Sequence, residues 1–356
     1  MKIIVIPVAV ILLALAILLV SCATSYADKR NRSPNFQGGE FKNTNPIKMH
    51  SFWKIAWTAL TTDIDRAAWP KWVDTKADNA PRALVRDGDI RITFINHATF
   101  LIQAGGFNIL TDPVFSQRTS PVSFAGPKRV HKPGIEMDEL PSVDVIIISH
   151  DHYDHLDLDS VNQLMKRDNP RVYLGLGVGR RLAASGNVVE MDWWESAQVA
   201  ENFELWFLDV QHFSGRSLTD RNSTLWGGFL LQLGDKKIYF GGDSGYADHY
   251  KRTYERFGPV DIAFLPIGAY APRSMFKSVH LDPFEAVQAH IDLQADLSIG
   301  MHYGTFQISA ESRREPIELL EQARRQANVD SSAFITLEVG TPFELTTSNE
   351  AAAVSF

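Results

Sequence analysis

The chain has a single cysteine in 356 residues, Cys22, so no disulfide can form within it. It also lacks an excess of positive charge, because its formal net charge is −7 and no cluster of Lys and Arg stands out. Proteins bind phosphate backbones through such clusters, which argues against nucleic acid as the main partner. No internal repeat and no low-complexity stretch interrupt the body of the chain. With 45% hydrophobic residues, a chain of this length can bury one large core.

The N-terminus carries a nearly pure apolar run, Ile3 to Val20, preceded by Lys2. Its length suits a transmembrane helix, whereas its flanks are typical of a secretory signal peptide. The residues Leu19-Val20-Ser21-Cys22 resemble a bacterial lipobox, in which the chain is cut before a cysteine that carries lipid. Lipidation explains an unpaired cysteine in an exported protein. The alternative is an uncleaved signal anchor, and both interpretations tether the protein to a membrane.

These features predict a lipid-anchored protein of the bacterial cell envelope, on the periplasmic side of the outer membrane if the source has one. We divide the chain into a signal peptide (1–21), a tether and lead-in (22–48), a main domain (49–346) and a C-terminal tail (347–356). The domain begins with an aromatic segment from Ser51 to Val73. This segment can pack on the body, shape an acyl pocket or lie at a lipid interface. It contains Trp53, Trp57, Trp69 and Trp72.

Strand patterns come first in the body and helix patterns follow in both halves. Residues 89–95 alternate as a strand does, residues 203–240 are rich in strands, and Gly234-Asp235 predicts a hairpin turn. Asp282-Pro283-Phe284-Glu285 is a helix start signal. The order of elements predicts an α+β fold, an αβ/βα sandwich of two mixed sheets with helices on both outer faces. The other expected elements are helices near 160–167, 179–184 and 316–325 and a last strand over 333–337.

The most informative motif follows the apolar run from Val143 to Ile148, a predicted buried strand. Four potential metal ligands fall within six residues there, and the i, i+2 spacing of the first two sends both imidazoles to one side of an extended backbone. Imidazoles and carboxylates are ligands that zinc accepts. A His-rich surface loop that arose by chance is the alternative. The four residues are His150, His152, Asp154 and His155.

This motif resembles the HxHxDH signature of the metallo-β-lactamase superfold, which implies further ligands later in the chain. That superfold adds a third His to the first site, an Asp between the two ions, and a late His to the second site. His212, Asp243 and His302 occur in this order, each at the end of a predicted strand. Taken singly, each could equally be a hydrogen-bonded core residue.

Several longer stretches resemble the family of N-acylphosphatidylethanolamine-hydrolysing phospholipase D over about Phe41 to Glu344. Pro-Ile-Gly-Ala-Tyr at 266–270 and His-Tyr-Gly-Thr-Phe at 302–306 are the most specific of them. The resemblance implies a phospholipase D-type hydrolase with two Zn²⁺ per chain, acting on N-acylphosphatidylethanolamine-like phospholipids through a metal-bridging hydroxide. It implies that His150, His152 and His212 hold one ion, that Asp154, His155 and His302 hold the other, and that Asp243 bridges them. Tyr153 and His280 match positions that contact the phospholipid head group.

Other roles follow from the neighbourhood of the motif. The leaving alkoxide needs a proton or a metal contact, and Asp151 and His280 are the candidates for it. Asp112 and Asp157 are candidates to orient the imidazoles, although each could equally cap a turn or a helix. His97 has no ligand spacing but lies in a family-like stretch, and His290 is expected in the core. The alternatives to a phospholipase are a carbonyl hydrolase of the same fold, such as a lactonase or thioesterase, and a non-enzymatic metal-binding envelope protein.

Overall fold

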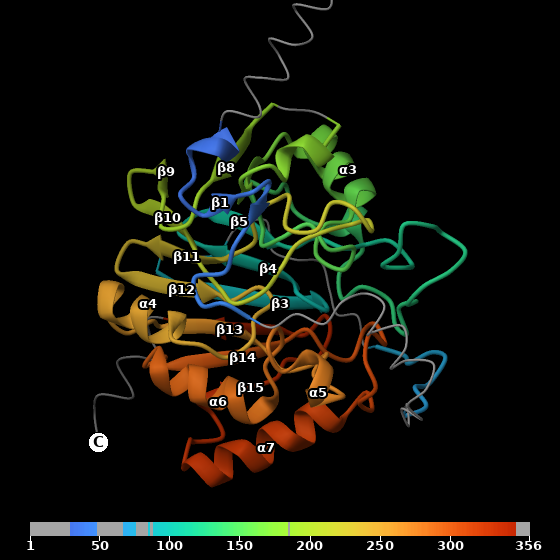
Figure 1. Cartoon of the computed structure of the whole chain (residues 1–356). Helices are drawn as coiled ribbons and strands as arrows, with labels where there is room; N and C mark the ends of the chain where they lie inside the picture. The colour runs from blue at the N-terminus through green and yellow to red at the C-terminus, as the bar shows by residue number, and fades with distance from the viewer. Residues whose placement is uncertain (1–28, 48–66, 76–84, 86–87, 184–185, 347–356) are drawn as a thin grey trace, which may run out of the picture.

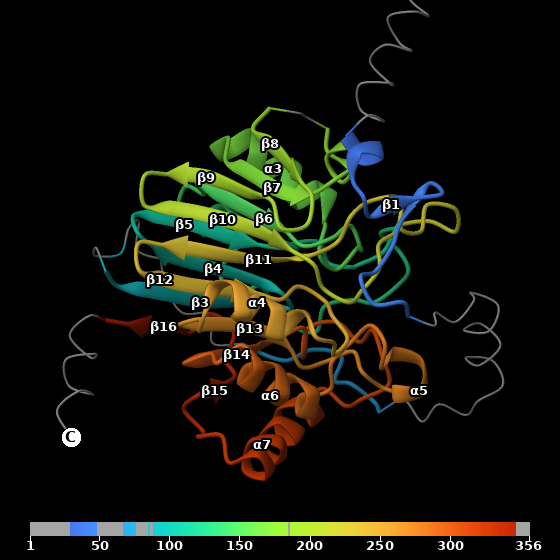
Figure 2. The same cartoon turned by 60° about the vertical axis from the view of Figure 1, so that its left-hand side comes forward.

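A computed structural model describes residues 29–47, 67–75, 85, 88–183 and 186–346. Within these residues two seven-stranded sheets pack face to face, with helices on both outer sides (Figure 1). Helix α3 (Leu158–Asp168) covers one sheet, whereas α4 (His249–Phe257), α6 (Pro283–Asp292) and α7 (Glu315–Ala327) lie beyond the other (Figure 2). The αβ/βα sandwich predicted from the order of elements is therefore confirmed.

The first sheet combines antiparallel and parallel pairing. Its antiparallel half runs from β9 to β12, and its parallel half continues from β12 to β15. In spatial order the strands are β15 (Phe334–Ile335), β14 (Leu297–Met301), β13 (Ile262–Pro266), β12 (Lys236–Phe240), β11 (Gly228–Leu233), β10 (Phe203–Leu208) and β9 (Ser196–Ala200).

The second sheet has the same mixed design. Strands β16, β3, β4 and β5 are antiparallel neighbours, and β5 to β8 are parallel. In spatial order they are β16 (Pro342–Leu345), β3 (Ile90–Asn96), β4 (Thr99–Ala104), β5 (Phe107–Thr111), β6 (Val145–Ile148), β7 (Arg171–Gly175) and β8 (Val188–Met191).

The main core lies between the two sheets. Phe100 on β4 packs on Phe264 of the facing sheet, with ring centroids 4.6 Å apart, and on Phe94 of its own sheet. All three rings are buried. A second apolar cluster joins β6 and β7 to Val161 and Leu164 of α3. Strand β6 is buried on both faces for this reason, which explains its continuous apolar sequence.

Most predicted elements are present, but β7, β8, β9, β13 and α4 were not predicted from the sequence. The hairpin turn at Gly234-Asp235 joins β11 to β12, and α6 begins with Asp282 accepting the backbone N–H of Glu285 at 2.9 Å. The helix predicted over 179–184 is only a short 3₁₀ turn, Gly179–Arg181. Strand β16 was not predicted, because Pro342 weakens a strand pattern and is accepted only at a sheet edge.

The predicted tether contains a folded part. Residues 29–47, here named the N-terminal strap, include the short strands β1 (Phe36–Gln37) and β2 (Glu40–Phe41). Phe41 is fully buried in the main core, and its N–H donates to the carbonyl of Asn222 at 2.8 Å. The sparse apolar pattern of this segment concealed its fold, because one buried aromatic side chain and several polar contacts hold it in place.

Only the end of the aromatic segment is described. The indole N–H of Trp69 donates to the Glu311 carbonyl at 2.9 Å, while Trp72 is 44% exposed. This end therefore packs against the body. Cys22, the predicted signal peptide, Trp53 and Trp57 lie outside the described residues, as does the predicted tail at 347–356. Among the described residues, no helix has the length and apolar character needed to cross a membrane.

Candidate metal centre

The seven predicted ligands come together at one edge of the sandwich. His150 and the rest of its motif follow β6 in the second sheet, whereas His212, Asp243 and His302 follow β10, β12 and β14 in the first. The carboxyl ends of these four strands point toward the same rim, which is where open sheets of this kind present functional groups. Residues far apart in sequence therefore meet there on rigid supports.

The first group of donors consists of three histidines. His150 Nε2 lies 2.8 Å from His152 Nδ1, and His212 Nε2 lies 3.4 Å from the same nitrogen. The three ligand atoms lie within 4.8 Å of one another. His150 and His212 are almost completely buried. Three imidazole nitrogens converging on one point make a typical site for zinc.

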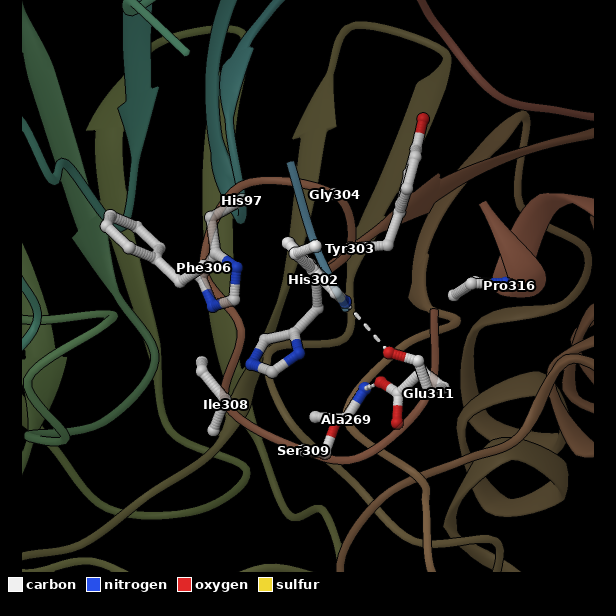
Figure 3. A pocket seen from close by; sticks show the side chains of 11 residues that line it. His97, Ala269, His302, Tyr303, Gly304, Phe306, Ile308, Ser309, Glu311 and Pro316 are labelled. Atoms are coloured by element: carbon white, nitrogen blue, oxygen red, sulfur yellow. Dashed lines mark hydrogen bonds between the residues drawn. The ribbon is translucent and has the colours of Figure 1, made fainter. Parts of the chain in front are cut away.

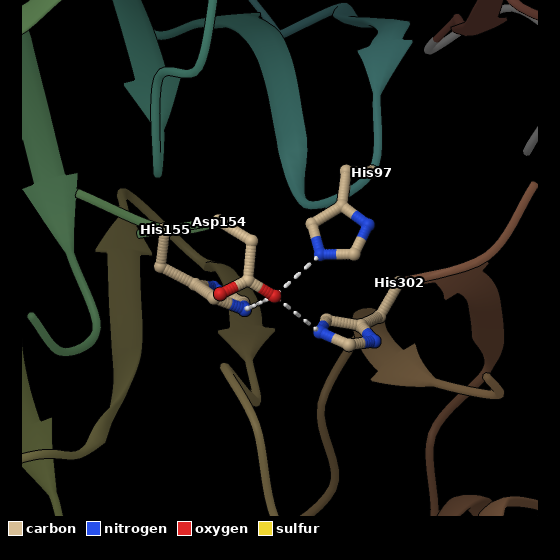
Figure 4. A group of neighbouring side chains, drawn as sticks. All are labelled: His97, Asp154, His155 and His302. Carbon is tan, nitrogen blue, oxygen red and sulfur yellow. Dashed lines mark hydrogen bonds and ion pairs between the residues drawn. The ribbon is translucent and has the colours of Figure 1, made fainter. Parts of the chain in front are cut away.

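The second group surrounds one carboxylate oxygen (Figure 4). Asp154 Oδ2 lies 3.1 Å from His97 Nε2, 3.3 Å from His302 Nε2 and 3.6 Å from His155 Nε2. The sequence placed His97 in a family-like stretch but gave it no ligand role, because the residues around it have no ligand spacing. Its Asn-His-Ala-Thr stretch after a strand was the available signal. The group also contains the three residues expected at the second ion.

Asp243 stands between the two groups. Its Oδ2 lies 3.2 Å from His155 Nε2 and 3.1 Å from His302 Nε2. The same oxygen lies 3.9 Å from His150 Nε2 and 3.7 Å from His212 Nε2. A carboxylate in this position can share its oxygens between two cations.

Hydrogen bonds orient three of the imidazoles through the ring nitrogen that faces away from the centre. His150 Nδ1 lies 2.9 Å from Ser149 Oγ, His155 Nδ1 lies 2.7 Å from Asp112 Oδ2, and His212 Nδ1 lies 2.8 Å from the Val279 carbonyl oxygen. Such partners fix the ring orientation of metal-binding histidines. Asp112 therefore has the orienting role considered for it. Asp157 does not, because its carboxylate accepts the N–H groups of Phe115 and Ser116 instead.

The centre contains buried polar atoms that suit a cation. Asp243 Oδ1, His155 Nε2 and His302 Nε2 are buried without a hydrogen-bond partner among the described residues. Unpaired buried polar atoms are costly, and they persist where a ligand or ion satisfies them. The residues present therefore fit metal ions, and their nitrogen and oxygen donors suit zinc and related transition metals.

The charges of the centre are strongly coupled. Burial by itself raises the pKa of Asp243, but the charges of His155 and His302 outweigh it and hold that pKa well below the ordinary value. Burial opposes protonation of His302, yet Asp243 and Asp154 raise its pKa to about 9. Without a cation, protons on the imidazoles thus neutralise the carboxylates. A bound cation replaces those protons.

His97 and His302 also border a small pocket (Figure 3). Their ring centroids are 4.0 Å apart, and Phe306 lies on the far side of His97. Glu311 closes the pocket by accepting the N–H of Ala269 at 2.6 Å. Burial and the neighbouring His302 lower the pKa of His97 to about 3, so this ring is neutral.

The two predicted substrate contacts lie beside the centre. His280 Nδ1 is 3.8 Å from Asp243 Oδ2, and burial lowers the pKa of this histidine to about 4. The Tyr153 hydroxyl donates to the Arg216 carbonyl at 3.0 Å, and the Arg216 guanidinium lies 3.8 Å from the centre of the Tyr153 ring. Tyr153 therefore brings a cationic side chain close to the motif.

Both carboxylate oxygens of Asp151 are occupied by contacts within the protein. One carboxylate oxygen pairs with Arg181 at 3.0 Å, and the other accepts the Gly215 N–H at 2.8 Å. These contacts assign it to anchoring the loop that carries Arg216, and they argue against the proton-donor role considered for it. His290 lies outside the centre and bonds to Ser298, as expected of a core histidine.

Comparison with known proteins identifies the superfamily of the chain. A family model described as "Beta-lactamase superfamily domain" matches residues 107–303. The chain is 37% identical over 267 residues to an N-acyl-phosphatidylethanolamine-hydrolyzing phospholipase D from Caenorhabditis elegans, which covers 71% of this chain and 75% of that protein. It is 44% identical over 97 residues to outer membrane protein RomA of Klebsiella pneumoniae, covering 27% of this chain and 71% of that protein.

Solved structures agree on the fold. A metallo hydrolase from the archaeon Ignicoccus hospitalis superimposes with a TM-score of 0.54 at 19% identity, covering 72% of this chain and 98% of that one. Similarity at this level concerns the arrangement of strands and helices alone.

Proposed function

Since the chain belongs to the beta-lactamase superfamily of metallo-hydrolases and has relatives named N-acyl-phosphatidylethanolamine-hydrolyzing phospholipase D, we propose that it is a dinuclear zinc phosphodiesterase of the phospholipase D type. The observation that carries the proposal is the pair of donor groups meeting at Asp243. The substrate is an N-acylphosphatidylethanolamine-like phospholipid. Cleavage on the head-group side of the phosphate gives a phosphatidic acid and an N-acylethanolamine.

His150, His152 and His212 would hold one zinc ion. Asp154, His155 and His302 would hold the other, with Asp243 shared between them. When bound, two zinc ions lower the pKa of a water toward about 7 and neutralise charge on the phosphate. The protein contributes a rigid, buried frame for this chemistry, because every donor is fixed at the end of a strand or in the loop after it.

Two side chains are placed to act on the substrate, His280 and Arg216. His280 is neutral, and its Nδ1 has no hydrogen-bond partner among the described residues, so it can hydrogen-bond a phosphate oxygen. Arg216, stacked on Tyr153, supplies positive charge beside the motif and attracts the anionic head group. The anchoring of its loop by Asp151 keeps this charge in position.

The N-terminus would place the enzyme at its substrate. Lipidation of Cys22 anchors the domain to a membrane, and anchoring raises the effective concentration of a phospholipid without a new contact. The relative named as an outer membrane protein supports a cell-envelope location. The same argument favours a lipid phosphodiester over a soluble substrate.

The test is product analysis with zinc-loaded, full-length protein and vesicles that contain N-acylphosphatidylethanolamine. Mass spectrometry should detect phosphatidic acid and N-acylethanolamine, and Asp243→Asn should abolish both products. Release of free fatty acid would instead indicate cleavage of a carboxyl ester. Turnover of lactones or nitrocefin with the phospholipid untouched would favour a carbonyl hydrolase, and zinc binding without turnover of any of these would favour a non-enzymatic envelope protein.

A further inference from the structure

The backbone of His212 is clamped by a side chain from the N-terminal strap. The Asn43 side-chain amide donates through Nδ2 to the His212 carbonyl at 2.8 Å, and its Oδ1 accepts the His212 N–H at 3.1 Å. One amide thus satisfies both backbone polar groups of a residue 169 positions away. The pattern imitates the two hydrogen bonds of a neighbouring strand.

His212 depends on such a partner because of where it lies. Strand β10 ends at Leu208, so His212 stands in irregular backbone beyond the sheet. The residue is fully buried, and a buried N–H or C=O without a partner is destabilising. Its ring is fixed separately, through Nδ1 and the Val279 carbonyl. Asn43 therefore fixes the backbone from which the ring projects.

The strap is held firmly on both sides of Asn43. Before it, Phe41 is buried in the main core. After it, the Thr44 hydroxyl donates to Asp209 Oδ2 at 2.7 Å, and Asn45 Nδ2 donates to Asp248 Oδ1 at 2.6 Å. Asp209 lies three residues before His212, so the strap contacts this loop twice. Asn43 is consequently presented from a rigid support.

We propose that Asn43 is a positioning residue that sets the position of His212 in the donor group formed with His150 and His152. This inference rests on the proposed metal centre. It extends the description of that centre to the N-terminal strap, which holds the backbone of His212 through Asn43. Asn43 itself touches neither the cation nor the substrate. Its removal should weaken one cation site and leave the other unchanged.

The experiment is zinc titration of the full-length, metal-free protein in competition with a chromogenic chelator. Loss of a group that orients a ligand typically costs about 10–100-fold in metal affinity, so Asn43→Ala should weaken one of the two binding steps by this factor. Asn43→Asp keeps the acceptor for the His212 N–H and loses the Nδ2 donor, and we expect an intermediate loss. Asn45→Ala is the matched control, since it breaks a neighbouring strap contact that does not involve His212, and both steps should stay unchanged.

The outcomes separate this inference from the metal centre itself. If wild type binds two zinc ions and both Asn43 variants bind them with wild-type affinities, the positioning role is refuted while the metal centre stands. If Asn43→Ala weakens both steps equally, or Asn45→Ala does the same as Asn43→Ala, the strap acts through general stability and the inference is also refuted. If wild type binds no zinc, the proposed centre fails first and the inference fails with it.

Discussion

Replacing Asp112 by Asn tests whether an orienting hydrogen bond controls the second cation site. Asp112 is fully buried and accepts three hydrogen bonds, from His155 Nδ1 at 2.7 Å, from the Ser149 N–H at 2.7 Å and from the Ser149 hydroxyl at 2.6 Å. Its φ of +31° is better tolerated by Asn or Asp than by most residues, so the substitution preserves the backbone. What changes is the charge and one acceptor.

The size of the effect follows from these contacts. The Asn amide keeps one acceptor oxygen, but an NH₂ group replaces the other. That NH₂ group faces a donor whose hydrogen bond the carboxylate accepted, so this hydrogen bond is lost. Hydrogen bonds to charged groups contribute about 1.5–3 kcal/mol each. Losing one of them at His155 corresponds to about a 10–100-fold loss of zinc affinity, since 1.4 kcal/mol is tenfold. Measured effects of removing such partners from metal-binding histidines have the same range, about 10–100-fold.

The assay is zinc affinity of metal-free protein, with melting temperature measured in parallel. Asp157→Asn is the matched control, because Asp157 is also largely buried and bonds to backbone N–H groups of the same region without contacting His155. It should lower the melting temperature and leave zinc affinity unchanged. Wild-type zinc affinity in Asp112→Asn would refute the reasoning, as would an equal loss of affinity in Asp157→Asn.

Three further predictions concern the shared ligand, protons and the anchor. Asp243→Ala should retain at most one tightly bound zinc and lose nearly all hydrolysis, measured by elemental analysis and product formation; two ions or normal turnover would remove Asp243 from its bridging role. The pKa of His302 is raised from 6.5 to about 9 in the absence of metal, so zinc affinity should increase as pH rises toward 9, with proton release seen by calorimetry in buffers of different ionisation enthalpy. The raised pKa of His302 also stabilises the metal-free fold, fully below pH 6.5, and this stabilisation is lost as pH rises through about 9. The melting temperature of the metal-free protein should therefore fall between these pH values, and a rise would contradict the assignment. Cys22→Ser should leave the precursor uncut and unlipidated, and an unmodified Cys22 in wild-type protein extracted from membranes, measured by intact mass, would disprove the anchor.

Local patterns in the sequence predicted the class of fold and placed four donors of the centre within one motif. The apolar run before His150 predicts a buried strand, and spacing within the motif places its donors together regardless of the rest of the fold. The capping signal at Asp282 and the hairpin at Gly234-Asp235 also depend on neighbouring residues alone, and both are found where expected. Such features are readable because their causes lie within a few residues of chain.

Only the tertiary structure decided which distant residues surround these donors. His97 lies in the turn between β3 and β4 and reaches Asp154, which follows β6, although β5 lies between β4 and β6 in the sheet. No spacing in the sequence records that proximity. Asn43 meets His212 across 169 positions because Phe41 anchors the strap in the core. Asp112 and Asp157 have the same chemistry and similar burial, yet only Asp112 accepts a hydrogen bond from an imidazole. Contacts of this kind depend on how loops distant in sequence are brought together by the tertiary fold, which the order of residues along the chain does not display.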